Sequence, residues 1–227
     1  MRGHGDSANV DYGYKIYRLA LDVHEFLTAH ALHEMTLMDH SMGCSIIWSY
    51  WDIFGADRTS QLVLIDQPPM LTGNPTWAEA EIQQYGAVFT PEAVLNLVNG
   101  LYSEASEQVV AGLIGGMFTE QAPDEMKQYV LELNQKIPGK QAANLLYNHC
   151  HQDWRDVIPR INIPTLIVSG RTSFVPWQSQ QWIHEQIAGS QVVYFEQDEG
   201  GQHFMFIENP TKFNQTVRDF VQTHAFE

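Results

Sequence analysis

"TLMDHSMGCS", residues 36–45, is the stretch on which both the fold and its chemistry depend. An apolar run leads to Ser41, and a helix-like segment begins directly after it. The pattern is close to the nucleophile elbow G-x-S-x-G, with Asp39 in place of the first glycine. Such a turn needs small residues on both sides; Gly43 meets this need, and Asp39 meets it in part because Asp tolerates unusual backbone angles. Ser41 is therefore either a nucleophile on a tight turn or an ordinary helix N-cap.

A serine nucleophile needs a base to take its proton, and His203 is the histidine whose surroundings suit that role. It lies in the glycine-rich stretch "EGGQHFMFIENP", residues 199–210, after the last expected strand and before the last expected helix. A loop there can bring the imidazole over the turn at Ser41. His40 is adjacent to Ser41 but points away from it in a tight turn, and the other histidines have no special context.

The base in turn needs an acid to orient it. One place for this acid is the turn after the expected strand 163–170, but that turn offers only Ser173. Asp66 ends the strand that follows the elbow helix, and we predict that it is the acid, against the alternative of a simple turn residue. Asp198 is a second alternative, less favoured because it is so close to His203 in the same loop.

Strands alternate with helices along the chain, which predicts an α/β fold with a parallel sheet and crossover connections. The expected strands are residues 35–38, 61–66, 163–170 and 191–197. Helices are expected over 14–32, 177–187 and 209–224, the last capped by Asn209. The middle of the chain is all-helical, with segments at 77–85, 91–102, 104–117, 123–136 and 140–151. We therefore divide the chain into a first core part (1–69), a helical insertion (70–160) and a second core part (161–227).

Composition excludes several classes of partner. Twelve Lys and Arg against 27 Asp and Glu give a net charge of −15, which repels nucleic acids and anionic membranes. Cys44 and Cys150 form neither a metal pattern nor a disulfide framework, so we expect buried free thiols, no metal and no cofactor. No apolar run is long enough to span a bilayer, and the polar residues 2–6 interrupt any secretory signal, which favours the cytoplasm.

Together these motifs resemble the α/β-hydrolase superfamily. "DHSMG" (39–43) looks like its elbow, "GGQHFMFIENP" (200–210) like its histidine loop, and "RGHGDS" (2–7) like the loop after its fourth strand. "LVLIDQPP" (62–69) resembles the strand and turn where some members carry their acid. The resemblance implies a mostly parallel, eight-stranded sheet with a helical lid, to which the helical insertion corresponds. A serine in the elbow implies ester, lactone or related acyl chemistry.

The same resemblance places the family's first strands and one oxyanion loop before "RGHGDS", so we expect an N-terminally truncated sheet. The backbone N–H of Met42 is then the expected oxyanion donor. The Ser41 strand would form a hydrophobic sheet edge that needs a pairing partner, and a homo-oligomer is one way to supply it.

We therefore expect a serine hydrolase that cleaves carboxylic esters or lactones of small hydrophobic substrates through an acyl-enzyme, with Ser41, His203 and Asp66 as catalytic residues. Apolar and aromatic side chains are the usual lining of a small-molecule pocket. The residues expected to contact substrate are His40, Trp154, Trp177 and Phe204. The alternative is a non-catalytic relative that binds a ligand or serves a structural role.

Overall fold

The centre of the molecule is a parallel sheet whose four strands follow one another in space as they do in the sequence. The computed structural model describes residues 1–224. The strands are β1 (Met35–His40), β2 (Thr59–Ile65), β3 (Thr165–Gly170) and β4 (Gln191–Phe195), in the order β1-β2-β3-β4. Each pair of neighbours is parallel. The four expected strands are thus present, and within the described residues they form the smaller sheet that the sequence predicted.

The two central strands are apolar on both faces because helices cover both sides of the sheet. Every residue of β2 and β3 is buried. Successive side chains of a strand point to opposite faces, so Leu62 and Leu64 join one apolar cluster and Val63 and Ile65 join another. This explains why the strands read as continuous apolar runs rather than as an alternating pattern.

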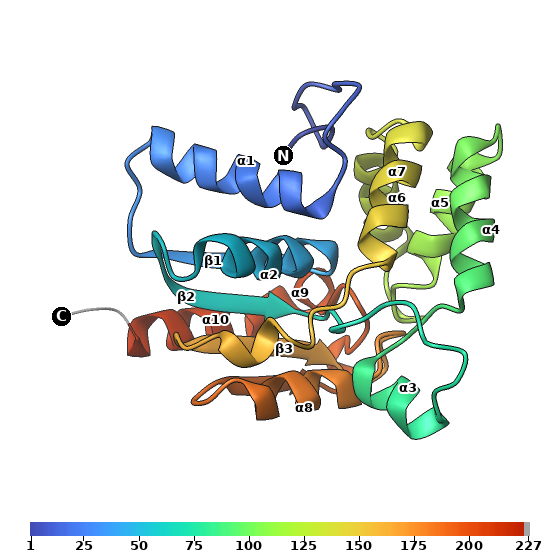
Figure 1. The fold of residues 1–227 in the computed structure, drawn as a ribbon. Helices are drawn as coiled ribbons and strands as arrows, with labels where there is room; N and C mark the ends of the chain where they lie inside the picture. Colours follow the sequence, from blue (N-terminus) through green and yellow to red (C-terminus); the bar gives the residue numbers. More distant parts are fainter. Residues whose placement is uncertain (225–227) are drawn as a thin grey trace.

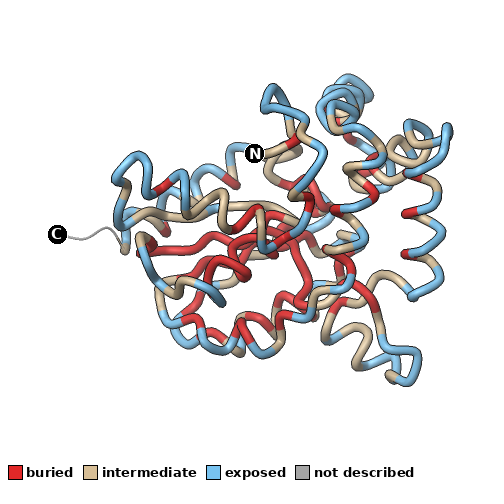
Figure 2. Tube along the Cα trace, turned by 45° about the horizontal axis from the view of Figure 1, so that its top comes forward, coloured by how far each residue is buried: buried red, intermediate tan, exposed pale blue. Residues whose placement is uncertain are grey.

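One face of the sheet packs against residues of α1 (Ile16–Ala29), α2 (Met42–Phe54) and α8 (Trp177–Gln186). The other packs against α9 (Met205–Glu208) and α10 (Pro210–Thr223). The start of α10 agrees with the sequence prediction, because the Asn209 side chain accepts a hydrogen bond from Lys212 N. Figure 2 shows the buried residues gathered in the strands and in the helix faces that cover them.

Residues 70–160 contain the expected helices: α3 (Glu79–Tyr85), α4 (Pro91–Tyr102), α5 (Ser106–Gly115), α6 (Asp124–Asn134) and α7 (Gly139–Cys150). These five helices gather beyond the carboxyl ends of the strands (Figure 1), and the chain then returns to the sheet through a short 3-10 turn, η1 (Ile158–Arg160). Buried residues of α4 and α7, among them Val94, Val98 and Ala143, share a small apolar core of their own. The role of this segment as a lid stays a prediction.

Two glycines let the loop that carries His203 lie against the ends of the strands. A Cβ at Gly170, the last residue of β3, would lie 2.3 Å from the carbonyl oxygen of Gly201. A Cβ at Gly201 would lie 2.2 Å from the carbonyl oxygen of Phe195. Side chains do not fit at such distances, so this contact requires glycine at both positions. Before the loop, the chain makes a second 3-10 turn, η2 (Gln197–Glu199).

In the part of the chain that the structure describes, no helix combines the length and the apolar character needed to cross a lipid bilayer.

A buried histidine in α7 makes the fold sensitive to acid. His149 is 5% exposed, and its Nδ1 has no hydrogen-bond partner within residues 1–224. Burial lowers the pKa of His149 to about 3. An unfolded histidine has a pKa of about 6.5. The unfolded state therefore binds more protons than the folded state between these values, and stability falls as the pH falls through this window.

We predict that acidification from pH 7.5 to 5.0 removes about 2 kcal/mol of folding stability through His149 alone. His149→Phe should shrink the loss by about this amount, because the variant has no imidazole to protonate on unfolding. Urea unfolding at the two pH values measures the difference. The exposed neighbour His151 provides the control variant His151→Phe. An unchanged pH dependence in His149→Phe would contradict the assignment.

Candidate active site

Ser41 occupies the single residue between β1 and α2, in a conformation that few non-glycine residues adopt. Its φ of 53° and ψ of −124° lie outside the common regions for L-amino acids. Its backbone N–H donates to the carbonyl of Ile65 at 2.8 Å, which ties the turn to β2. The Ser41 hydroxyl makes no capping hydrogen bond to α2, so the N-cap alternative does not describe this serine. The geometry is that of a strained elbow.

Asp39 is tolerated in this elbow because Gly43 has no side chain. The carboxylate of Asp39 lies over Gly43, so that a Cβ there would be 1.9 Å from Asp39 Cγ. The same carboxylate accepts the backbone N–H of His40 at 2.8 Å. Burial raises the pKa of Asp39 above its ordinary value. The elbow thus accepts a larger residue on the strand side and demands glycine on the helix side.

The predicted base and acid are in direct contact. Asp66 Oδ2 lies 2.8 Å from His203 Nδ1, and the two side chains are 0% and 1% exposed. Asp66 directly follows β2 and has a φ of 52°, a left-handed conformation that Asp accepts more readily than most residues. Asp198, the alternative acid, is exposed in η2 and makes no bond to His203 within the described residues. Of the two acids considered, the structure brings Asp66 to the histidine.

The Asp66 carboxylate is held by more donors than the sequence suggested. Ser173 Oγ donates to Asp66 Oδ2 at 2.5 Å. Ser169 Oγ and the backbone N–H of Gly170 lie 3.1 Å and 3.3 Å from Oδ1. The end of β3 and the turn after it, which lacks an acid, therefore contribute hydrogen bonds to the acid of the neighbouring strand. Sequence reasoning gave Ser173 no part in the site, and this correction follows from a contact between two separate strand ends.

Ser41 and His203 open into the same cavity, whose volume is about 420 Å³. No hydrogen bond joins Ser41 Oγ to His203 in the described residues; such bonds often form only when substrate is bound. The lining is mainly aliphatic and comes from α4, α5, α7 and their flanks: Leu101, Val110, Leu113, Ile114, Met117, Ile137, Ala142, Leu145 and Leu146. A larger hollow of about 730 Å³ lies between residues 119–126 and 197–209 and includes neither Ser41 nor His203.

The residues predicted to contact substrate divide into two pairs. His40 and Phe204 line the cavity. Trp154 does not: it is buried in the core, where its Nε1 donates to Ser45 Oγ at 3.1 Å. Trp177 also lies elsewhere, on the surface, with its ring against the guanidinium of Arg171. Sequence reasoning favoured these large aromatics and missed the aliphatic faces of the helices, which had been visible only as ordinary amphipathic periodicity.

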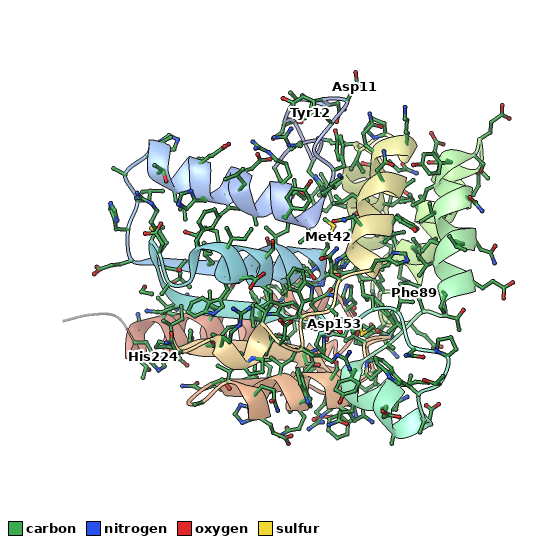
Figure 3. All side chains as sticks on the ribbon, in the orientation of Figure 1. Asp11, Tyr12, Met42, Phe89, Asp153 and His224 are labelled. Atoms are coloured by element: carbon green, nitrogen blue, oxygen red, sulfur yellow. The ribbon has the colours of Figure 1, made fainter. Side chains whose placement is uncertain are left out.

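Met42, the predicted oxyanion donor, is the first residue of α2 (Figure 3) and lines the cavity beside Leu145 and Leu146 of α7. The first N–H groups of a helix have no partner within it. Among the described residues the Met42 N–H donates no hydrogen bond, so it is free to bind a developing negative charge. His4, which was not predicted, lines the same cavity from the N-terminal loop.

Residues 1–210 match the family model described as alpha/beta hydrolase fold. The chain belongs to the alpha/beta hydrolase family. This confirms the resemblance drawn from the elbow and the histidine loop, and with it the predicted fold class. The family hosts more than one chemistry, so membership alone does not fix the reaction.

Known proteins of the family are similar to this chain over most of its length. The non-heme chloroperoxidase CPO-A1 of Kitasatospora aureofaciens is 28% identical over 177 residues, which are 74% of this chain and 60% of that relative. This chain thus spans about three fifths of that curated relative. An esterase structure from Exiguobacterium antarcticum has a TM-score of 0.86 at 26% identity and covers 97% of this chain and 79% of its own. An enol-lactonase structure from Burkholderia xenovorans has a TM-score of 0.76 at 21% identity, with coverages of 97% and 78%, and shows the shared fold.

We predict that Gly43→Ala disrupts the elbow, because its methyl group would occupy the space of the Asp39 carboxylate. The melting temperature and the rate of Ser41 labelling by an active-site probe should both fall. Asp39→Gly vacates that space, so the double variant Asp39→Gly/Gly43→Ala should recover most of the loss. Equal damage in the single and double variants would show that the clash is not with Asp39.

For the ester hydrolysis that the sequence predicts, we expect Ser173→Ala to lower kcat by about 10- to 100-fold, because a hydrogen bond to a charged group contributes about 1.5–3 kcal/mol. Asp66→Asn should cost far more, about 10⁴-fold by analogy with a serine protease, since it favours the wrong imidazole tautomer. Steady-state kinetics on one ester substrate compare the two variants with the native protein. A Ser173→Ala variant with native kcat would show that the hydrogen bond from Ser173 to Asp66 has no part in the reaction.

Proposed function

We propose that this protein is a serine hydrolase that cleaves carboxylic esters or lactones through an acyl-enzyme. The observation that carries the proposal is the buried hydrogen bond between Asp66 and His203, because the His203 side of this pair lines the same cavity as a strained Ser41. A carboxylate on Nδ1 leaves Nε2 of the imidazole as the acceptor for a serine proton. The order Ser, Asp, His along the chain is that of α/β-hydrolases.

Each residue has a distinct part in the proposed reaction. Ser41 Oγ attacks the carbonyl carbon while His203 Nε2 takes the hydroxyl proton, and Asp66 stabilises the charged imidazole that results. The Met42 N–H stabilises the oxyanion of the tetrahedral intermediate. When the intermediate collapses, the C–O bond to the alcohol breaks and His203 returns the proton to the leaving oxygen. Water, deprotonated by His203, then attacks the acyl carbon, the bond from that carbon to Ser41 Oγ breaks, and His203 returns the proton to Ser41 Oγ as the acid is released.

The cavity favours small to medium hydrophobic acyl groups. Its walls are aliphatic over most of their surface, and a volume of about 420 Å³ suits a small organic ligand. Asp39 is the acidic residue among the lining side chains, and the whole protein has a net charge of −15. Both disfavour anionic substrates. The structural neighbours named as an esterase and an enol-lactonase support an ester or a lactone as the substrate.

Labelling with a fluorophosphonate probe and turnover of p-nitrophenyl esters of increasing acyl length test the proposal. We expect an adduct on Ser41, and we expect Ser41→Ala to lose at least about 10³-fold in kcat, because the nucleophile itself is removed. Ser103→Ala, at an exposed serine in the helical segment, is the control and should behave as the native protein.

Two outcomes count against the proposal. A folded protein that neither reacts with the probe nor hydrolyses any ester or lactone, yet is stabilised by a hydrophobic ligand, would be the non-catalytic binding protein. Because one relative is named a non-heme chloroperoxidase, the panel includes chloride with hydrogen peroxide. If Ser41→Ala still oxidises halide, the reaction of this protein does not depend on Ser41 as a nucleophile.

A further inference from the structure

His40 is the residue directly before the nucleophile, yet its imidazole is bonded to the loop of the base. His40 Nε2 lies 2.9 Å from the backbone carbonyl oxygen of His203. The two imidazole rings are 4.2 Å apart between centroids. The bond joins the end of β1 to a loop 163 residues further along the chain. It is therefore a direct link between the nucleophile's strand and the base.

The surroundings of His40 settle which proton makes this bond. A carbonyl oxygen only accepts hydrogen bonds, so Nε2 of His40 must carry the hydrogen. Burial, and next the proximity of His203, lower the pKa of His40 well below its ordinary value. The imidazole is thus neutral, with its hydrogen on Nε2 and directed at the His203 carbonyl.

Aromatic side chains fix the orientation of the His40 ring. Phe204 and Phe206 lie 5.3 Å and 4.8 Å from it between ring centroids, and both come from the segment that follows His203. Close-packed rings leave a partly buried side chain such as that of His40 little rotational freedom. The donor therefore stays aligned with the carbonyl, and the loop cannot slide along β1 without breaking this bond and disturbing the packing.

His203 is consequently held at two points with different effects. Asp66 binds Nδ1 of the side chain and sets the rotation of the imidazole. His40 binds the carbonyl of the backbone and sets how far the loop lies from β1, whose end carries Ser41. The distance from His203 Nε2 to Ser41 Oγ depends on both constraints.

We propose that His40 is a positioning residue, which places His203 over Ser41 by donating a hydrogen bond from Nε2 to the His203 carbonyl. The inference rests on the proposed hydrolase function and adds a residue to its machinery. It assigns His40 a role other than the substrate contact expected from the sequence, and the experiment below separates the two. Misplacement of a catalytic group by about 1 Å costs on the order of 10²-fold in rate. Loss of the bond should therefore lower kcat while the aliphatic walls, and with them KM, stay as they are.

The test compares two substitutions at position 40. His40→Phe keeps an aromatic ring but removes the donor, and we expect kcat to fall about 10- to 100-fold with KM within about twofold of native. His40→Gln keeps an N–H donor at similar reach, and we expect it to recover most of kcat. His30→Phe, at an exposed histidine, is the control. His40→Met serves as the donor-free variant should His40→Phe not fold.

Three results would overturn the inference: native kcat in the donor-free variant, equal damage in His40→Gln and His40→Phe, or a raised KM at unchanged kcat, which would mark a substrate contact. If the native protein itself neither turns over nor reacts with the probe, the proposed function fails instead. Proton NMR still decides the role of His40 in that case. The Nδ1–H signal of His203 bonded to Asp66 should be sharp in the native protein and His40→Gln and broadened in His40→Phe; an unchanged signal would contradict the positioning role.

Discussion

A single buried carboxylate connects the parts of this molecule that must meet for it to have a site. Asp66 accepts hydrogen bonds from the end of β3, from the turn after it, and from the histidine loop. A carboxylate without partners would be very unfavourable in such a place, because it is fully shielded from water. The strand ends and the loop therefore have to close around Asp66 in one arrangement, and this same arrangement presents His203 to the cavity. The same hydrogen bonds to Asp66 therefore stabilise the fold and assemble the site.

The sequence predicted the sheet well because its signals are local. The fully buried strands β2 and β3 each contain a continuous apolar run. The elbow and the glycine-rich histidine loop have short motifs, and each motif has a steric cause. Asp66 could be named because the alternative turn offered no acid, and its contact with His203 agrees with that reasoning. Local pattern and steric requirement were sufficient for these features.

What the sequence did not reveal depends on contacts between distant segments. Ser173 is an unremarkable turn serine until the ends of β2 and β3 are side by side. His40 was expected to contact substrate and it lines the cavity, but its bond to the His203 carbonyl joins segments 163 residues apart and has no signal in the sequence. Trp154 was chosen for its size, and size equally suits a core position, which is where it lies. Side-chain type alone does not separate these roles.

The position of β1 in the sheet gives the nucleophile and its partners unequal anchoring. Within the described residues β2 is the one strand that pairs with β1, and Met38 in β1 is 50% exposed, whereas β2 and β3 are buried throughout. Edge strands open to solvent at lower free energy than central strands, and their amides exchange hydrogen sooner. A local opening of β1 would carry Ser41 away while Asp66 and His203 remain joined. Ser41, the proposed nucleophile, thus lies at the end of a strand with weaker anchoring than the strand that carries Asp66, the proposed acid.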